Sequence, residues 1–432
     1  MQERVPVRSV GLIAPMLFTL NGMIGAGIFA LPAILTGSVG AFAPLLIIAV
    51  GLLHFPSAFI LSRLSRRFDS NGGPVLYAEA AFGKFVSFQV GLGAMIAQVV
   101  ALAANALIMI TYLAALFPPL AQPAIHLTAT LATLIAATLL ALAGMRKSVR
   151  TLGLITFIKL TPLVLLLIGG FLFGSPQISV SPPAAGDYRS AILITFYAYT
   201  GLVYAVLSAG EVRHARRNVT IAIAAVLIGV TLFYALLVVA FAAIMPEGGG
   251  ENALAMAAGK LAGPAGTIAI VIAAGFSIWA NLLNGIVAMP RLVYGMAEQE
   301  ILPRWFGHLS RRRLVPDNAI ILIGGMACVM AMWGDFETLA TINVVANILG
   351  GCIMVLVLPV LRWREPGTDG RRVDAVEILI SFIAGAVLVG LTWMAGGAPF
   401  AQILPMLIGG TLLYGIARLT VLLSARRGIA SA

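Results

Sequence analysis

The first apolar segment contains, at its middle, the glycine-rich stretch Gly22-Met23-Ile24-Gly25-Ala26-Gly27-Ile28-Phe29. That segment runs from about residue 10 to residue 35, which exceeds the roughly 20 residues that a helix needs to cross a bilayer. Glycine costs about 1 kcal/mol relative to alanine in a helix interior, so the three glycines predict an interruption. A membrane helix can leave its hydrogen-bond ladder only where the freed backbone groups face protein or a water-filled cavity. The stretch therefore predicts a break beside a cavity at mid-membrane, and such a cavity indicates a substrate site.

The composition is that of a polytopic membrane protein. Of the 432 residues, 60% are hydrophobic and 10% are charged, and a soluble domain could not cover that much apolar surface. The net charge of +11 comes from short basic clusters between apolar runs, which is the pattern that orients membrane proteins, so nucleic-acid binding is not expected. Cys328 and Cys352 both fall in apolar runs and indicate neither a disulfide framework nor a metal site.

Signatures of catalysis are not found in the sequence. We find no phosphate loop, catalytic triad, paired carboxylates or metal cluster. We therefore expect a protein that is not an enzyme, that needs no cofactor and that does not use ATP.

The apolar runs predict an all-α membrane protein with twelve spans. They cover approximately residues 10–35, 39–62, 86–117, 126–144, 151–174, 189–210, 219–245, 262–296, 317–334, 337–361, 374–395 and 400–423. Arginine and lysine gather in alternate connections, for example Arg63, Arg66 and Arg67 after the second span. By the positive-inside rule this pattern predicts a multi-pass protein of the cytoplasmic membrane with both termini in the cytoplasm.

A second interruption is predicted in the sixth span. Phe196-Tyr197-Ala198-Tyr199-Thr200-Gly201 combines polar side chains with glycine, five spans after the first interruption. Two interrupted spans at equivalent places indicate inverted repeats with a binding site between them. We predict a first repeat over residues 1–174, a second over residues 189–361, and two added spans with a cytoplasmic tail over residues 374–432.

Four motifs, in order along the chain, resemble those of the amino acid–polyamine–organocation transporter superfamily. They are the first-span stretch, Ser70-Asn71-Gly72-Gly73-Pro74 with Tyr77 and Phe82, the sixth-span stretch with Arg216-Arg217-Asn218, and Pro290-Arg291 through Leu302-Pro303. The resemblance covers most of the chain and implies a five-plus-five inverted-repeat, leucine-transporter-like fold with discontinuous first and sixth helices. It also implies an amino acid permease that works by alternating access. Ala215 and Thr220 stand where the family usually has proline, so the resemblance names no subfamily.

The first interruption is expected to bind the polar head of an amino acid. The glycines alone are also consistent with close helix packing. The resemblance implies that N–H groups of Gly25, Ala26 and Gly27, at the start of the outer half-helix, bind the carboxylate, because a helix N-terminus favours an anion. Carbonyl groups of both interruptions would then face the ammonium group. The predicted substrate-binding residues are Met23, Ile24, Gly25, Ala26, Gly27, Tyr197, Ala198, Tyr199, Gly201, Asn281 and Asn284.

The side chain of the substrate is expected to be neutral, and apolar or small. No Asp or Glu lies deep in any predicted span, so a cationic side chain would have no partner in a low dielectric. In the arginine-transporting antiporters of the superfamily, an acidic residue stands two positions after the sixth-span glycine, where this chain has Val203. The tyrosines of the sixth span, including Tyr204, either border the pocket or pack against neighbouring helices.

Other polar residues inside spans leave two interpretations open. Cavity contacts and interhelical hydrogen bonds are about equally consistent with them. The pairs are Gln98 and Asn105, and Asn281 and Asn284. For a third pair, Asn343 and Asn347 in the tenth span, the two interpretations are gating and helix packing. His54, a lone histidine among apolar residues, is interpreted as structural.

Lys159 lies about two turns into the fifth span. A lysine some 10 Å from the membrane surface can snorkel to it, whereas ionisable residues inside spans are functional candidates. The resemblance implies that this lysine takes the place of a coupling sodium ion near the broken first helix. We therefore expect Lys159 either to tether the first span to the fifth or to relay a proton.

The sequence thus predicts a sodium-independent secondary transporter of neutral amino acids, with proton coupling as a further expectation. Its partners would be the amino-acid substrate, protons and the lipid bilayer. An exchanger of amines, polyamines or amino acids with the same fold is the main alternative. A non-transporting nutrient sensor or a channel is a more remote one.

Overall fold

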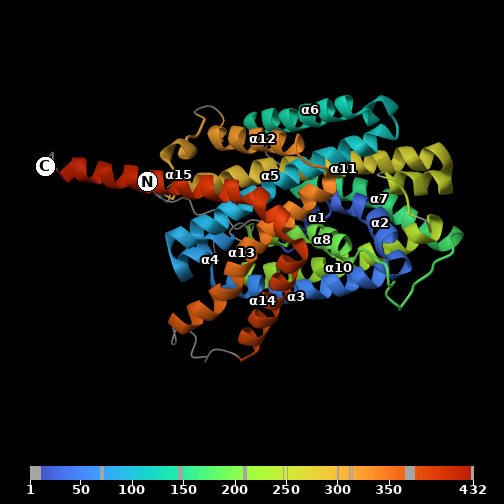
Figure 1. The fold of residues 1–432 in the computed structure, drawn as a ribbon, viewed down its shortest axis with the longest axis horizontal. Helices are drawn as coiled ribbons and strands as arrows, with labels where there is room; N and C mark the ends of the chain where they lie inside the picture. The colour runs from blue at the N-terminus through green and yellow to red at the C-terminus, as the bar shows by residue number, and fades with distance from the viewer. Residues whose placement is uncertain are drawn as a thin grey trace.

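The chain folds into a bundle of α-helices, most of which run along the long axis of the molecule (Figure 1). The computed structural model describes residues 11–68, 73–144, 149–207, 212–246, 248–250, 252–298, 301–310, 313, 315–364 and 375–429. These residues contain α-helices and short 3₁₀ turns and no strand, which confirms the predicted all-α class. Parts of the motifs quoted above, namely Ser70-Asn71-Gly72 and Gln299-Glu300, lie outside the described residues.

The helices follow the apolar runs of the sequence closely. Their bounds are α1 (Ile13–Met23), α2 (Gly27–Val39), α3 (Ala43–Arg67), α4 (Gly73–Phe82), α5 (Lys84–Ala114), α6 (Pro123–Leu142), α7 (Val149–Phe173), α8 (Tyr188–Ala198), α9 (Val203–Leu207), α10 (Ala215–Ile244), α11 (Ala253–Glu298), α12 (Asp317–Ala331), α13 (Phe336–Arg364), α14 (Ala375–Ala395) and α15 (Gly397–Ile429). Short 3₁₀ turns lie between some of them: η1 (Gly40–Phe42), η2 (Pro118–Ala121), η3 (Thr200–Leu202) and η5 (Arg304–Gly307).

The described helices have the lengths and the apolar character expected of a polytopic membrane protein. Ten helical stretches among the described residues are long and apolar enough to cross a membrane, and α1 and α12 are shorter apolar helices. Each of the twelve predicted spans coincides with one helix or with a pair of consecutive helices. Large apolar side chains such as Phe173, Phe382 and Trp393 are exposed on the outer surface, as lipid contact requires. The twelve-span inverted repeat itself stays a prediction.

The first interruption is present where the glycines predict it. Helix α1 ends at Met23, residues 24–26 are not helical, and α2 begins at Gly27. The backbone of Ile24 has φ −82° and ψ 80°, which takes the chain out of the helix. The second interruption is milder, because Tyr199 and the turn η3 separate α8 from α9.

The two interruptions touch one another. A Cβ atom added at Gly201 would overlap the backbone of Gly22 and Met23, and one added at Gly27 would lie 3.1 Å from the Cβ of Ala198. Glycine is thus required where the backbones of the two broken spans approach most closely.

The core lies around these interruptions. Helix α5 packs along α13 and α11, and α3 packs along α10. Fully buried aromatic side chains fill the space between the helices, and Phe29 meets Tyr112 edge to face with ring centroids 5.3 Å apart. The Tyr112 hydroxyl donates a hydrogen bond of 2.8 Å to the carbonyl oxygen of Phe29 and so anchors α2 to α5.

A charge cluster attaches α14 to the bundle. The carboxylate of Glu377, in the first turn of α14, is buried and lies 3.3 Å from Nε of Arg362 on α13 and 3.7 Å from Nε of Arg63 on α3. Two arginines from separate helices therefore share one acid.

Candidate functional site

A cavity of about 500 Å³ lies against both interruptions. This volume is within the usual range of small-molecule sites. Helices α4, α5, α11 and α13 supply the remaining walls. The lining residues are Gly22, Met23, Gly25, Ala26, Gly27, Val75, Leu76, Ala94, Ala97, Gln98, Ala101, Asn105, Tyr197, Ala198, Thr200, Gly201, Val203, Tyr204, Asn281, Ala288, Met289, Arg291, Leu292, Gly295, Met296, Asn343 and Asn347.

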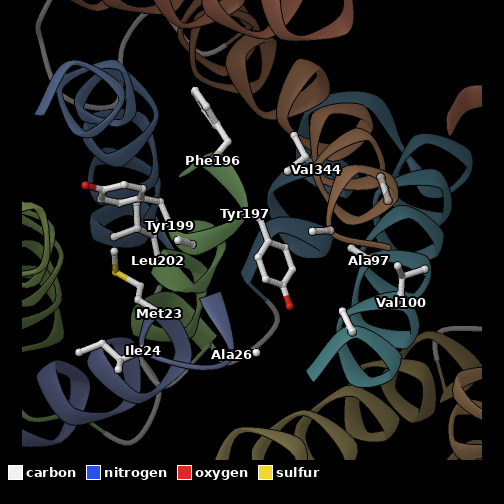
Figure 2. Packing of buried hydrophobic residues seen from close by; sticks show 14 of the residues in the cluster. Met23, Ile24, Ala26, Ala97, Val100, Phe196, Tyr197, Tyr199, Leu202 and Val344 are labelled. Carbon is white, nitrogen blue, oxygen red and sulfur yellow. The ribbon is translucent and has the colours of Figure 1, made fainter. Parts of the chain in front are cut away.

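Most of the predicted site residues meet at this cavity. Met23, Gly25, Ala26, Gly27, Tyr197, Ala198, Gly201 and Asn281 line it. Figure 2 shows Tyr197 projecting from α8 with its hydroxyl group directed toward Ala26. The residues for which the sequence left the role open, Gln98, Asn105, Tyr204, Asn343 and Asn347, line it as well.

Three predicted residues lie elsewhere. Ile24, Tyr199 and Asn284 are not among the lining residues. Tyr199 is fully buried, and its hydroxyl donates a hydrogen bond of 3.1 Å to Thr231 Oγ1 on α10. Tyr199 thus packs between helices, which is the alternative that the sequence had left open for it.

The carbonyl groups of the first interruption bind protein groups in this structure. The oxygen of Ile24 accepts hydrogen bonds from Lys159 Nζ at 2.9 Å and from Ser277 Oγ at 3.3 Å. The oxygen of Met23 accepts one from the Tyr234 hydroxyl at 3.1 Å. The expectation that both carbonyls face a substrate ammonium group therefore differs from the arrangement observed, since Ile24 faces Lys159 and not the cavity.

Lys159 reaches the break from α7 and is fully buried. Its bond to the Ile24 carbonyl means that the ammonium group points inward to the interrupted helix. Snorkelling to the membrane surface, the other interpretation of this lysine, is not the arrangement observed.

Two carboxamides cap the broken ends of the first span. Asn105 Oδ1, from α5, accepts a hydrogen bond from the Ala26 N–H at 2.9 Å, at the start of α2. Asn281 Nδ2, from α11, donates to the carbonyl oxygens of Asn21 at 2.9 Å and Gly22 at 3.3 Å, at the end of α1. The two amides are joined, because Asn105 Nδ2 donates to Asn281 Oδ1 at 3.2 Å. One N–H group at the start of α2 and two carbonyl groups at the end of α1 thus have side-chain partners.

Further amides extend along the cavity away from the break. The Tyr204 hydroxyl donates to Gln98 Oε1 at 2.9 Å, which joins α9 to α5. On α13, Asn347 Nδ2 donates to Asn343 Oδ1 at 3.0 Å, and Asn343 Nδ2 donates to the Ala97 carbonyl at 2.7 Å. The wall therefore offers neutral donors and acceptors.

The wall of the cavity carries little formal charge. Among the described residues that line the cavity, Arg291 is the one with a formal charge, and none is Asp or Glu. Arg291 is exposed and lies on the last third of α11, with Leu292, Gly295 and Met296. The cavity thus extends from the interruptions toward α4 and the C-terminal part of α11.

Part of the cavity wall was not predicted from the sequence. Ala94, Ala97 and Ala101 share one face of α5 with Gln98 and Asn105, and their i, i+3, i+7 spacing could have indicated a cavity-lining stripe. Val75 and Leu76 on α4 carried no such signal, since only the tertiary fold brings α4 beneath the cavity.

His54 is buried among aromatic side chains, an environment consistent with the structural interpretation. It is buried on α3, with its ring 4.2 Å from that of Phe196 and 4.8 Å from that of Tyr199, between centroids. Its Nδ1 lies 2.9 Å from the Val50 carbonyl oxygen. The ring is therefore a stacked partner of the second interruption.

Comparison with known proteins agrees with this architecture. A family model described as amino acid permease matches residues 10–414. An uncharacterized transporter of Mycobacterium tuberculosis (strain ATCC 25618 / H37Rv) is 28% identical over 343 residues, covering 76% of this chain and 75% of that protein, and a Mycobacterium bovis counterpart matches equally. The vacuolar cationic amino acid transporter 4 of Arabidopsis thaliana is 24% identical over 374 residues, covering 79% of this chain and 61% of the plant protein. These relatives are transporters and not enzymes.

The family model covers nearly the whole chain, and the structure adds a broken first helix with a cavity against the break. This chain is therefore a member of the amino acid permease family, within the superfamily that its four motifs resemble, and it transports amino acids across a membrane.

Proposed function

We propose that the protein is a sodium-independent secondary transporter of neutral amino acids in the cytoplasmic membrane. The observation that carries the proposal is a cavity of about 500 Å³ that borders two helix ends of opposite partial charge. The N-terminus of α2, at Gly27, and the C-terminus of α8, at Ala198, meet with their Cβ positions 3.1 Å apart, and both line the cavity.

The two helix ends suit the two charges of an amino acid. A helix N-terminus carries partial positive charge and a C-terminus partial negative charge, each worth about 0.3–1 kcal/mol to an exposed ion and up to about 2 kcal/mol where partly buried. The carboxylate would bind the N–H groups at Ala26 and Gly27, and the ammonium group would bind the last carbonyls of α8. Gly25 allows this approach, since it adds no side chain to the chamber.

The wall favours a neutral side chain. A guanidinium or second ammonium group in the cavity would lie among amides, alanines and tyrosines and beside Arg291, with no carboxylate among the described lining residues. Burying an unpaired charge in that way is costly. The proposed substrate class therefore differs from the one in the name of the plant relative, a cationic amino acid transporter.

Lys159 supports sodium independence. Its ammonium group, together with Ser277 Oγ, binds the Ile24 carbonyl at the break, and it supplies a fixed positive charge where a coupling cation would otherwise stabilise the unwound carbonyls. A lysine buried among apolar helices is also a group that can release its proton, which is the basis for proposing proton coupling.

Alternating access would place this structure on the inward-facing side of the cycle. The cavity extends toward α4 and the C-terminal part of α11, and the positive-inside pattern predicts that end to be cytoplasmic. The two interruptions would belong to inverted repeats over residues 1–174 and 189–361. Movement of the broken helices against the remaining helices would then open the site to the other side.

Uptake by purified protein in liposomes tests the proposal. Labelled alanine, leucine, glutamine, arginine and putrescine are supplied in sodium-free buffer, with a proton gradient imposed or collapsed. We expect saturable accumulation of at least one neutral amino acid without sodium, and stimulation by the proton gradient. Faster uptake of arginine or putrescine would overturn the neutral substrate class. An absolute need for sodium would overturn the role of Lys159, and binding without accumulation would identify a sensor.

A further inference from the structure

The N–H group of Ala26, the first donor proposed for the substrate carboxylate, is already occupied by a side chain. Asn105 Oδ1 accepts its hydrogen bond at 2.9 Å, and Asn105 lines the same cavity. A carboxamide oxygen therefore stands where a carboxylate oxygen would bind. An amino acid can reach this donor only by displacing Asn105.

A carboxylate is the stronger of the two acceptors. Hydrogen bonds to an ionised acceptor are roughly twice as strong as those between neutral groups. The helix N-terminus at Gly27 adds a further preference for the anion. Replacement of the amide by the carboxylate is therefore favourable, while an empty site keeps its backbone donor satisfied by Asn105.

Displacement of Asn105 acts on the other half of the broken helix. The Nδ2 atom of Asn105 donates to Asn281 Oδ1 at 3.2 Å, and Asn281 Nδ2 holds the carbonyls of Asn21 and Gly22 at the end of α1. When Asn105 turns away from Ala26, its bond to Asn281 breaks or is redirected. Asn281 then loses the partner that fixes its amide on α1.

We infer that Asn105 and Asn281 form a relay by which the carboxylate of the substrate releases the end of α1. The inference rests on the proposed function. It adds that binding of the carboxylate at the start of α2 changes the hydrogen bonds at the end of α1. Asn105 and Asn281 are positioning residues for α1, and Asn105 is in addition the group that the substrate replaces.

Gly25 leaves space for the side-chain amides of Asn105 and Asn281. A Cβ atom at this residue would lie 2.9 Å from Asn281 Nδ2 and 3.3 Å from Asn105 Oδ1, closer than the two amides could accept without moving. The glycine between the two half-helices is therefore needed for the side chains as well as for the backbone.

A double-mutant cycle tests the relay. Asn105→Ala, Asn281→Ala and the double variant are compared with the unmodified protein for binding in detergent, by the shift of melting temperature with alanine, leucine and glutamine, and for maximal uptake rate in liposomes. Asn105→Ala is expected to bind no more weakly than the unmodified protein, because the substrate then meets no competing side chain at the Ala26 N–H. Each single variant is expected to transport about tenfold more slowly, the effect of one lost hydrogen bond. Both substitutions break the same chain of hydrogen bonds between Ala26 and the end of α1. The maximal uptake rate of the double variant should therefore also be about tenfold lower than that of the unmodified protein, and not a hundredfold lower.

Gln89→Ala is the matched control. It removes an amide from the same helix α5 and an interhelical hydrogen bond of 3.1 Å to Thr411 Oγ1, but it lies outside the cavity lining. Its uptake rate should stay within about twofold, because the lost bond touches neither the cavity nor the break in the first span. Rates that multiply in the double variant, or binding and rate that fall together in each single variant, would overturn the relay.

Asn105→Asp provides a second test that preserves the volume of the side chain. It keeps a carboxylate permanently at the Ala26 N–H, so amino-acid affinity should fall more than about tenfold. Unchanged affinity in this variant would show that Ala26 is not the shared donor and would overturn the relay. If the unmodified protein itself accumulates none of the three amino acids, the proposed function is wrong. If it accumulates one of them but the variants behave otherwise than expected, only the relay is wrong.

Discussion

The ammonium group of Lys159 lies 2.9 Å from the carbonyl oxygen of Ile24, the residue at which α1 stops being helical. One buried charge thus joins α7 to the point where the first span is broken. Ser277 reaches the same oxygen from α11, so three helices meet at a single backbone carbonyl.

Replacing Lys159 by methionine should slow transport by tenfold or more. The substitution keeps the length and apolar stem of the side chain but removes a hydrogen bond from a charged donor, worth about 1.5–3 kcal/mol. Initial uptake rates in liposomes measure the loss. Lys260→Met, an exposed lysine on α11, is the control and should transport normally. Unchanged rate and unchanged proton stimulation in Lys159→Met would remove both proposed roles.

Gly201→Ala should abolish transport. The added methyl group would overlap the backbone of Gly22 and Met23, which cannot turn aside as a flexible side chain can. Gly229→Ala on α10 places its methyl group in open space and should leave uptake intact, with a stability gain of up to about 1 kcal/mol. Uptake is measured after gel filtration shows that both variants are folded. Normal transport by Gly201→Ala would contradict the contact between the two interruptions.

Glu377→Ala should lower stability and leave substrate affinity unchanged. The variant leaves the guanidinium groups of Arg63 and Arg362 without the acid that they share, and we expect a cost of about 1–3 kcal/mol. The melting temperature in detergent reports the cost, and Arg364→Ala, an exposed arginine on the same helix end as Arg362, serves as the reference. A melting temperature equal to that of the reference would mean that the cluster does not hold α14.

His54→Phe should keep both the transport rate and its dependence on pH. Phenylalanine preserves the stacking against Phe196 and Tyr199, and it removes a group that ordinarily titrates near pH 6.5. Uptake between roughly pH 5 and pH 8 is the measurement. A flattened pH profile would make His54 the proton carrier in place of Lys159.

Local sequence predicted the backbone better than the side-chain contacts. Gly22, Gly25 and Gly27 located the first break because helix propensity acts over a few residues, and the structure ends α1 and begins α2 within that stretch. Apolar run length located the long helices for the same reason. The functional assignments of these residues remain predictions.

The missed contacts depend on how the helices pack. Asn105 and Asn281 are 176 residues apart in the chain, and nothing in either neighbourhood indicates that they bond to each other. Tyr199 and Tyr197 are two residues apart on one broken helix, yet one packs against Thr231 and the other lines the cavity. The direction of each side chain follows from the turn at Tyr199, which the sequence does not specify.

The amide-rich wall of the cavity has a thermodynamic consequence. A chamber of about 500 Å³ with five carboxamide side chains attracts solvent, on the order of ten water molecules at about 30 Å³ each. An amino acid entering the chamber exchanges places with that solvent, and larger aliphatic side chains expel more of it. Calorimetric titrations should accordingly show a heat-capacity change that becomes more negative from alanine to leucine.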